Sequence, residues 1–417
     1  MKLLITKNDY VFSIINKGVS AVTGFIIAAL VNRYLGPSLK GEYAYLMNII
    51  NVAAIIGNFG IYHSYPKSYK DGLSEVKNKY VSLILAQFII YTIIALTLGI
   101  ISKSLLYTIA FLIVPSQVAA NQLSMVVMVE KIRYRQYVQI YTLFLKTVIT
   151  LIVALTCPTS LIVVLGIILF INILQCLLYV WKIKTKLGIS YLTIDFIRYT
   201  IRFGIYAAIA DLLLIFNYKA DVLMLKYYVD YYQIGLYSVG AGIAECIWLI
   251  PDAFKEVLFS RTSRGTPIAE INLTIKINML VSVVLIVIMY IFGEQVLLIY
   301  SGEEYLEAID VTRIILLGVP AMSLFKVTNP LYLANGRQRL YCWILVVSVF
   351  ANIIMNLISI PFFGINGAAM ASVVSFSVCG IAFYGFYVKE YKIKWYEPLV
   401  FKPRDFQQIV QILSKNK

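Results

Sequence analysis

The chain has 417 residues, of which 60% are hydrophobic and 14% charged, and its formal net charge is +15. Its apolar residues form blocks of about twenty, the length an α-helix needs to cross roughly 30 Å of hydrocarbon, which excludes a soluble protein. The positive charge is spread over short connecting segments and not gathered on one surface, so no nucleic-acid partner is expected. The composition therefore predicts an all-α polytopic membrane protein.

The apolar blocks predict about twelve spanning helices, arranged as two six-helix bundles. In chain order their approximate limits are Tyr10–Val31, Tyr43–Ile61, Tyr80–Ile101, Leu105–Val129, Tyr137–Cys157, Leu161–Trp181, Ile201–Leu225, Ile234–Phe254, Ile271–Phe292, Ile309–Leu333, Tyr341–Ile360 and Gly367–Val388. We place an N-terminal lobe at residues 1–186, a C-terminal lobe at 187–388 and a basic tail at 389–417. No connecting segment is long enough to fold as a domain, so the function is expected inside the membrane.

The basic residues of the connecting segments indicate the orientation. Alternate connections are rich in lysine and arginine, whereas those on the other side hold only Arg33, Lys40, Lys103 and Lys226. Positively charged loops are retained in the cytoplasm. Both termini are therefore predicted to be cytoplasmic.

Lysines inside the spans are the first candidates for function. A charge in a spanning helix must face a partner or a water-filled cavity. Lys17, Lys146 and Lys326 lie deepest, and Lys219 lies near the outer end of the seventh span. We assign these four lysines to the binding of an anionic substrate; the alternatives are ion pairs between helices and side chains that reach the interface.

Three carboxylates are candidates for ion coupling. Asp211 and Glu245 fall near the middle of the seventh and eighth spans, and Asp221 lies two residues after Lys219. A buried carboxylate can pair with a lysine, take up a proton or help to bind Na⁺. For Asp211 the structural alternative is an ion pair with Lys17. Residues two positions apart do not share a helix face, so Lys219 and Asp221 are expected to have different neighbours.

The sequence contains few of the residues that enzymes use for catalysis. His63 is its one histidine, and its five cysteines have no CxxC spacing, so neither histidine-based catalysis nor a metal site is expected. No GxxxxGK[ST] run is present, which argues against an ATP-driven pump. We predict a transporter with no resident cofactor or metal, coupled to Na⁺ or H⁺ or driven by the gradient of its substrate.

A short internal repeat links the two halves of the chain. The segment Gly41-Glu42-Tyr43-Ala44-Tyr45 resembles Gly235-Leu236-Tyr237-Ser238-Val239, and both lie at the start of a span on the outer side. An even number of spans separates the two copies, so both enter the membrane in the same sense. This arrangement indicates a parallel repeat of two bundles.

Three stretches carry a resemblance to a known family. Arg33–Pro37 leading to Gly41-Glu42-Tyr43, and Asn217–Leu225 leading to Gly235–Ser238, resemble the signatures of Wzx-type polysaccharide flippases. These flippases belong to the multidrug/oligosaccharidyl-lipid/polysaccharide (MOP) exporter superfamily. Phe259–Arg264 is similar to the cytoplasmic turn of that family, although the proline often found there is absent.

The resemblance implies a V-shaped, MATE-like pair of lobes around a cationic cavity in the bacterial cytoplasmic (inner) membrane. The implied activity is translocation of an undecaprenyl-pyrophosphate-linked oligosaccharide to the outer leaflet, by alternating access, during O-antigen, capsule or exopolysaccharide assembly. Membrane lipids and other polysaccharide-assembly proteins are the implied partners. Buried lysines would attract the pyrophosphate strongly at low dielectric. Two alternatives remain: a cation-coupled multidrug exporter of the same superfamily, and a membrane enzyme acting on lipid-linked glycans.

Overall fold

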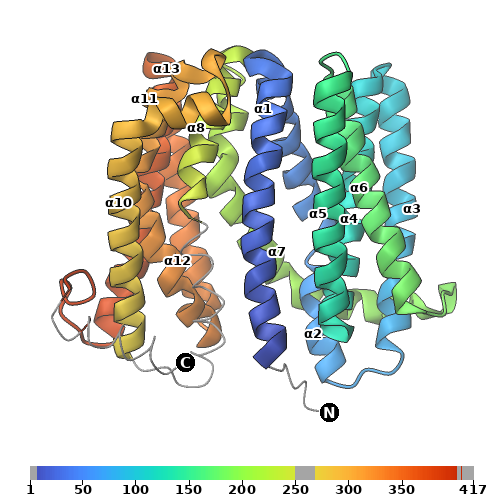
Figure 1. Ribbon diagram of the computed structural model, residues 1–417. Helices are drawn as coiled ribbons and strands as arrows, with labels where there is room; N and C mark the ends of the chain where they lie inside the picture. The colour runs from blue at the N-terminus through green and yellow to red at the C-terminus, as the bar shows by residue number, and fades with distance from the viewer. Residues whose placement is uncertain (1–6, 249–267, 402–404, 406–417) are drawn as a thin grey trace. The chain divides into compact units, whose positions relative to one another are not determined.

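The structure, a computed structural model, describes residues 7–248, 268–401 and 405 (Figure 1). The turn at Phe259–Arg264 and most of the basic tail lie outside this part of the chain. The described residues are helical almost throughout and include no strand, as the sequence predicted.

The helices follow the apolar blocks of the sequence. They are α1 (Lys7–Asn58), α2 (Ile61–Lys70), α3 (Val76–Ser102), α4 (Leu105–Glu130), α5 (Ile132–Thr156), α6 (Leu161–Ile183), η1 (Ile189–Tyr191), α7 (Ile194–Leu225), α8 (Tyr231–Cys246), α10 (Ile268–Tyr300), η2 (Glu303–Ala308), α11 (Ile309–Leu316), α12 (Val319–Ala334) and α13 (Gln338–Glu390).

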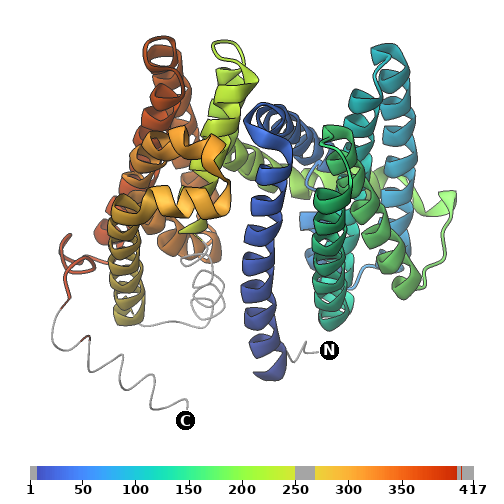
Figure 2. The ribbon, with the colours of Figure 1, turned by 45° about the horizontal axis from the view of Figure 1, so that its top comes forward.

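Two of these helices are long enough to hold two spans each. α1 bends at Gly36, whose φ of 68° suits a residue without a side chain, and Pro37 follows it. The chain reverses direction at this bend (Figures 1 and 2). α13 bends at Gly364, where φ is 54°, shortly after Pro361. Glycine and proline therefore end one span and begin the next without a loop.

The predicted number of spans agrees with these helices. Within the described ranges, eight helices are long and apolar enough to cross a membrane, and the bent pair α11–α12, with an angle of 53°, makes a ninth. Counting α1 and α13 as two spans each, and adding α8, whose predicted span continues past the described residues, gives the twelve expected. The fold class is confirmed.

Contacts divide the chain into two compact units, which we call unit 1 and unit 2. Unit 1 comprises Met1–Ile215 and Asp230–Gly235, and unit 2 comprises Phe216–Val229 and Leu236–Lys417. This division falls inside α7, so that one continuous helix contributes residues to both units. The limits placed at 186 and 388 remain divisions based on the sequence.

The core of unit 1 is organised around α4. One face of α4 joins an apolar cluster with α2, α3 and α6 that includes the buried Tyr65, Tyr80 and Tyr179. Another face joins a cluster with α1 and α6 around Ile113 and Leu165. The outer faces of the unit expose large apolar side chains, as expected of helices whose solvent is lipid.

The two glycines of the internal repeat pack backbone to backbone in unit 1. A Cβ on Gly41 would lie 1.8 Å from the carbonyl oxygen of Tyr231, and a Cβ on Gly235 would lie 1.9 Å from that of Pro37. Pro37 and Tyr231 each stand four residues before the glycine of their own copy. The contact is therefore symmetric between the copies, which is the geometry expected of a duplicated segment.

Candidate functional site

Asp211 of α7 is bound by two consecutive residues of α2 within unit 1. Its Oδ2 atom accepts a hydrogen bond from the Tyr62 hydroxyl and lies 2.8 Å from Nε2 of His63. The side chains of His63 and Asp211 are 30% and 31% exposed. The described partners of Asp211 therefore both come from α2, and neither is Lys17, the partner that the sequence offered as an alternative.

A close approach of two glycines brings α2 and α7 together. Gly60, with a φ of 69°, caps the start of α2, and a Cβ on it would lie 2.0 Å from the carbonyl oxygen of Gly204. His63 lies about one turn beyond Gly60, and Asp211 about two turns beyond Gly204, on the faces that meet. Sequence reasoning considered His63 only as a catalytic group and so missed it. The signal available was a lone histidine next to a tyrosine at the inner end of a span.

Lys219 and Glu245 form an ion pair in unit 2. The Nζ atom of Lys219 lies 2.6 Å from Oε1 of Glu245, and their side chains are 33% and 28% exposed. Asp221 instead is 2% exposed and accepts hydrogen bonds from the Tyr237 hydroxyl, from Ser372 at 2.8 Å and from the backbone N–H of Val222 at 2.8 Å. The prediction that Lys219 and Asp221 have different neighbours is confirmed.

We expect this ion pair to be needed for folding. A Lys219→Glu substitution places two carboxylates together, and like charges in a partly buried site are destabilising by an amount on the order of 2 kcal/mol. The yield of membrane-inserted protein, measured by immunoblot, is expected to fall to less than about half. The exchange K219E/E245K should recover most of that yield, and equal loss in the single and exchanged variants would contradict the pairing.

Buried hydrogen bonds extend this polar region along α7 and α13. Nδ2 of Asn217 donates to Oγ of Ser348 over 2.6 Å, and Oγ of Ser375 donates to Oδ1 of Asn217 over 2.9 Å. All three residues are at most 1% exposed. The end of α7 that carries Lys219 and Asp221 is thus held to α13 by side-chain hydrogen bonds within one unit.

Lys326 of α12 lies among aromatic rings in unit 2. Its side chain is 7% exposed, and its ammonium nitrogen is 5.2 Å from the centre of the Trp248 ring and 5.8 Å from that of Tyr218. The two rings are 5.3 Å apart. This geometry suits cation–π attraction between the ammonium group and the two rings.

Lys146 and Lys17 belong to unit 1. Lys146 is half-buried near the middle of α5, and among the described residues its ammonium group has neither an ion-pair nor a hydrogen-bond partner. Lys17 is half-buried on α1, a helix that packs against α5. The four candidate lysines therefore fall two in each unit, and a shared cationic cavity stays a prediction.

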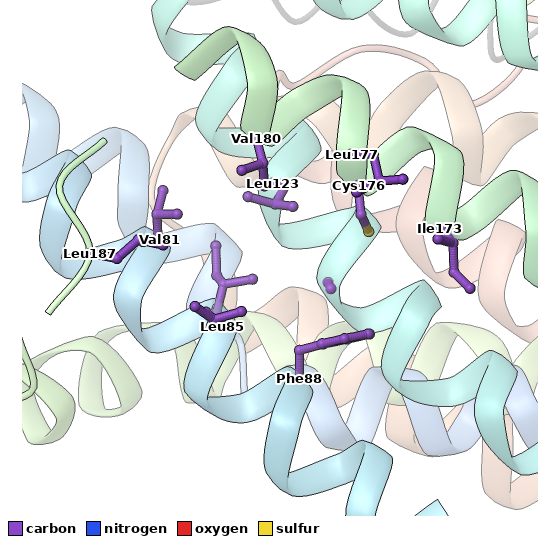
Figure 3. Close-up of a pocket in the computed structure, with 11 residues that line it drawn as sticks. Val81, Leu85, Phe88, Leu123, Ile173, Cys176, Leu177, Val180 and Leu187 are labelled. Carbon is purple, nitrogen blue, oxygen red and sulfur yellow. The ribbon is translucent and has the colours of Figure 1, made fainter. Parts of the chain in front are cut away.

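The hollows in unit 1 are apolar. One of about 270 Å³ lies between α3, α4 and α6, where Leu85, Phe88, Leu123 and Cys176 form part of its wall (Figure 3). A second, of about 610 Å³, lies between the second half of α1, α3 and α4. Several of their lining side chains are exposed, so both hollows open to the lipid-facing surface. None of the seven predicted site residues lines either hollow.

Among the described residues, no group of three or more histidine, cysteine, aspartate or glutamate side chains is arranged to hold a metal ion. The three candidate carboxylates occupy separate places, with different partners. Each carboxylate is therefore considered for ion coupling by itself and not as part of one shared site.

The long apolar helices define a multi-pass membrane protein. Residues 30–310 match a family model described as polysaccharide biosynthesis protein, and residues 258–407 match one described as lipid II flippase MurJ. The first match spans more than half of the sequence: the chain belongs to the polysaccharide biosynthesis protein family. No curated protein matches it.

Several solved structures have the same fold. Lipid II flippase MurJ in an inward closed conformation has a TM-score of 0.71 at 16% identity, over 96% of this chain and 90% of that chain. An inward-facing MATE family multidrug transporter of the MOP superfamily has a TM-score of 0.64 at 13% identity, over 89% and 94%. A point mutant of the Vibrio cholerae MATE transporter VcmN has a TM-score of 0.61 at 14% identity, over 91% and 95%. The chain therefore shares the fold of a lipid II flippase and of MATE family transporters.

Proposed function

We propose that this protein moves an undecaprenyl-pyrophosphate-linked oligosaccharide, the repeat unit of an O-antigen, capsule or exopolysaccharide, from the inner to the outer leaflet of the bacterial cytoplasmic membrane. Alternating access carries the head group across, and both termini lie in the cytoplasm. The polysaccharide biosynthesis family supports the class of substrate.

The observation that carries the proposal is Lys146. It is a half-buried lysine near the middle of α5, with no partner for its charge among the described residues. An unpaired cation in a spanning helix costs free energy, so an anion is expected to bind beside it during transport. A pyrophosphate is a multivalent anion, and a lysine ammonium is a common partner for phosphate oxygens.

The other candidate lysines fit further parts of the same substrate. Lys17 and Lys219 would contact the pyrophosphate at other stages of the cycle, with Lys219 leaving Glu245 to do so. Lys326 stands beside the rings of Tyr218 and Trp248. Aromatic rings with polar edges suit the apolar faces and hydroxyl groups of sugars.

The apolar hollows support a lipid-linked substrate. Both are walled by hydrocarbon side chains and open to the surface that lipid covers. An isoprenoid chain can therefore remain in contact with the protein without leaving an apolar environment.

Ion coupling is proposed for Asp211, Asp221 and Glu245. The carboxylate of Asp221 is deeply buried beside the hydroxyls of Tyr237 and Ser372. Oxygen ligands of this kind can hold either a proton or Na⁺ at a buried carboxylate. Release of the bound ion would change the charge of unit 2 during the transport cycle.

The alternative is a cation-coupled multidrug exporter, which MATE structures of the same fold support. Cells depleted of the protein decide between the two. We expect surface glycan to fall at least about tenfold, lipid-linked oligosaccharide to accumulate in the inner leaflet, and the minimal inhibitory concentrations of cationic drugs to stay unchanged. Unchanged glycan together with increased drug sensitivity would favour the exporter.

A further inference from the structure

The cluster of Tyr62, His63 and Asp211 is built around a single carboxylate oxygen. The hydroxyl of Tyr62 donates a hydrogen bond to Oδ2 of Asp211, and Nε2 of His63 lies 2.8 Å from the same oxygen. The rings of Tyr62 and His63 are also in contact, with their centres 4.0 Å apart. Three titratable groups thus share one hydrogen-bonded centre in unit 1.

Binding of one proton to His63 removes the net charge of this cluster. With a neutral His63 the cluster carries the single negative charge of Asp211, and with a protonated His63 it is a neutral ion pair. Histidine is the side chain whose ordinary pKa places this change between pH 5 and 8. A net charge is costly beside hydrocarbon, so the two states differ in how strongly α2 is held to α7.

Three charged or titratable side chains on the elements around the cluster have other partners. On α2, Lys67 lies 5.1 Å from the ring centre of Phe203 and 4.0 Å from Oδ2 of Asp71. On α4, Oε1 of Glu130 accepts the hydroxyl of Tyr65 over 2.9 Å, and on α3 the hydroxyl of Tyr80 lies 2.6 Å from Oγ of Ser64. Asp211 itself has Tyr62 and His63 as its hydrogen-bonding partners.

The backbone just before the cluster has an unusual conformation. Phe59 and Gly60 both have positive φ values, of 46° and 69°, and separate the short helix α2 from α1. A pair of left-handed residues between two helices is a natural hinge. On the other side, α7 continues past Asp211 without a break to Lys219 and Asp221 in unit 2.

We propose that Tyr62, His63 and Asp211 form a proton-operated latch between α2 and α7, and that the proton held there is the coupling ion of the transporter. A proton on His63 closes the latch through an ion pair, and its release leaves a weaker hydrogen bond, so that α2 and α7 are held together less strongly. The second part of this inference rests on the proposed function; the first part does not.

The test of the latch is hydrogen–deuterium exchange of the purified full-length protein in lipid nanodiscs. Between pH 6 and pH 8, after correction for the intrinsic exchange rate, protection of residues 61–70 is expected to fall about fivefold. His63→Gln, which keeps a hydrogen-bonding side chain but cannot titrate, should abolish this pH dependence. Tyr69→Phe, on the same helix but outside the cluster, should retain it.

The test of coupling is surface glycan in cells carrying the same variants. We expect H63Q to lower export at least about threefold while Y69F exports normally. Protection of α2 that does not depend on pH in the unsubstituted protein overturns the latch, whatever the glycan assay gives. A pH-dependent latch with normal export in H63Q overturns the assignment of the proton as coupling ion. Normal surface glycan after depletion of the protein overturns the proposed function and leaves the exchange result standing.

Discussion

Replacing Lys146 with methionine is expected to lower surface glycan by about tenfold or more, with lipid-linked oligosaccharide accumulating inside the cell. Methionine keeps the unbranched apolar stem that packs on α5 and removes only the ammonium group. A tenfold loss corresponds to about 1.4 kcal/mol, a modest value for one charge interacting with a pyrophosphate at low dielectric. Quantitative immunodetection of surface glycan, with extraction of lipid-linked intermediates, measures both effects.

Two variants control this experiment. Lys146→Arg retains the positive charge and should keep more activity than K146M. Lys186→Ala removes an exposed lysine from the segment between α6 and α7 and should export normally. Normal export by K146M at equal protein level would show that Lys146 does not meet the substrate, and the proposal would lose the observation on which it rests.

Replacing Gly41 with alanine is expected to remove nearly all folded protein from the membrane. The new Cβ would lie 1.8 Å from the carbonyl oxygen of Tyr231, and because this oxygen belongs to the backbone, no side-chain rotation relieves the clash. Gly235→Ala should fail equally, because its Cβ would lie 1.9 Å from the carbonyl oxygen of Pro37. The amount of monodisperse protein extracted in mild detergent measures the loss.

Gly24→Ala is the matched control for this experiment. Gly24 lies on the same helix, and a Cβ there would meet no atom within 4 Å. Alanine favours a helix over glycine by up to about 1 kcal/mol, so G24A should be neutral or stabilising. Full yield from G41A would mean that the backbones of α1 and α8 do not approach as the structure shows.

The spans could be predicted because the signal is local. A block of apolar residues long enough to cross the bilayer satisfies its own backbone hydrogen bonds as a helix, whatever surrounds it. The structure places Gly36 with Pro37, and Gly364 after Pro361, at the bends that separate two spans within α1 and α13. The repeated glycines at 41 and 235 were also visible, although their mutual contact was not.

The partners of the intramembrane charges could be predicted only in part. The local rule that residues two apart face different ways separated Lys219 from Asp221 correctly. No such local rule exists for residues far apart in the chain, so the sequence could offer Lys17 only as one alternative partner for Asp211. The close approach of Gly60 and Gly204 decides this pairing, because it brings His63 to Asp211 from 148 positions away in the sequence.

The sequence by itself thus determined the membrane class, the number of spans, the family resemblance and the set of charged side chains that require partners. Each of these depends on composition or spacing within one helix. Only the tertiary structure decided which charges meet, since that depends on where helix backbones can touch. In this protein they touch at glycines, and the glycine contacts between α2 and α7, and between α1 and α8, lie too far apart in the chain for any local pattern to reveal.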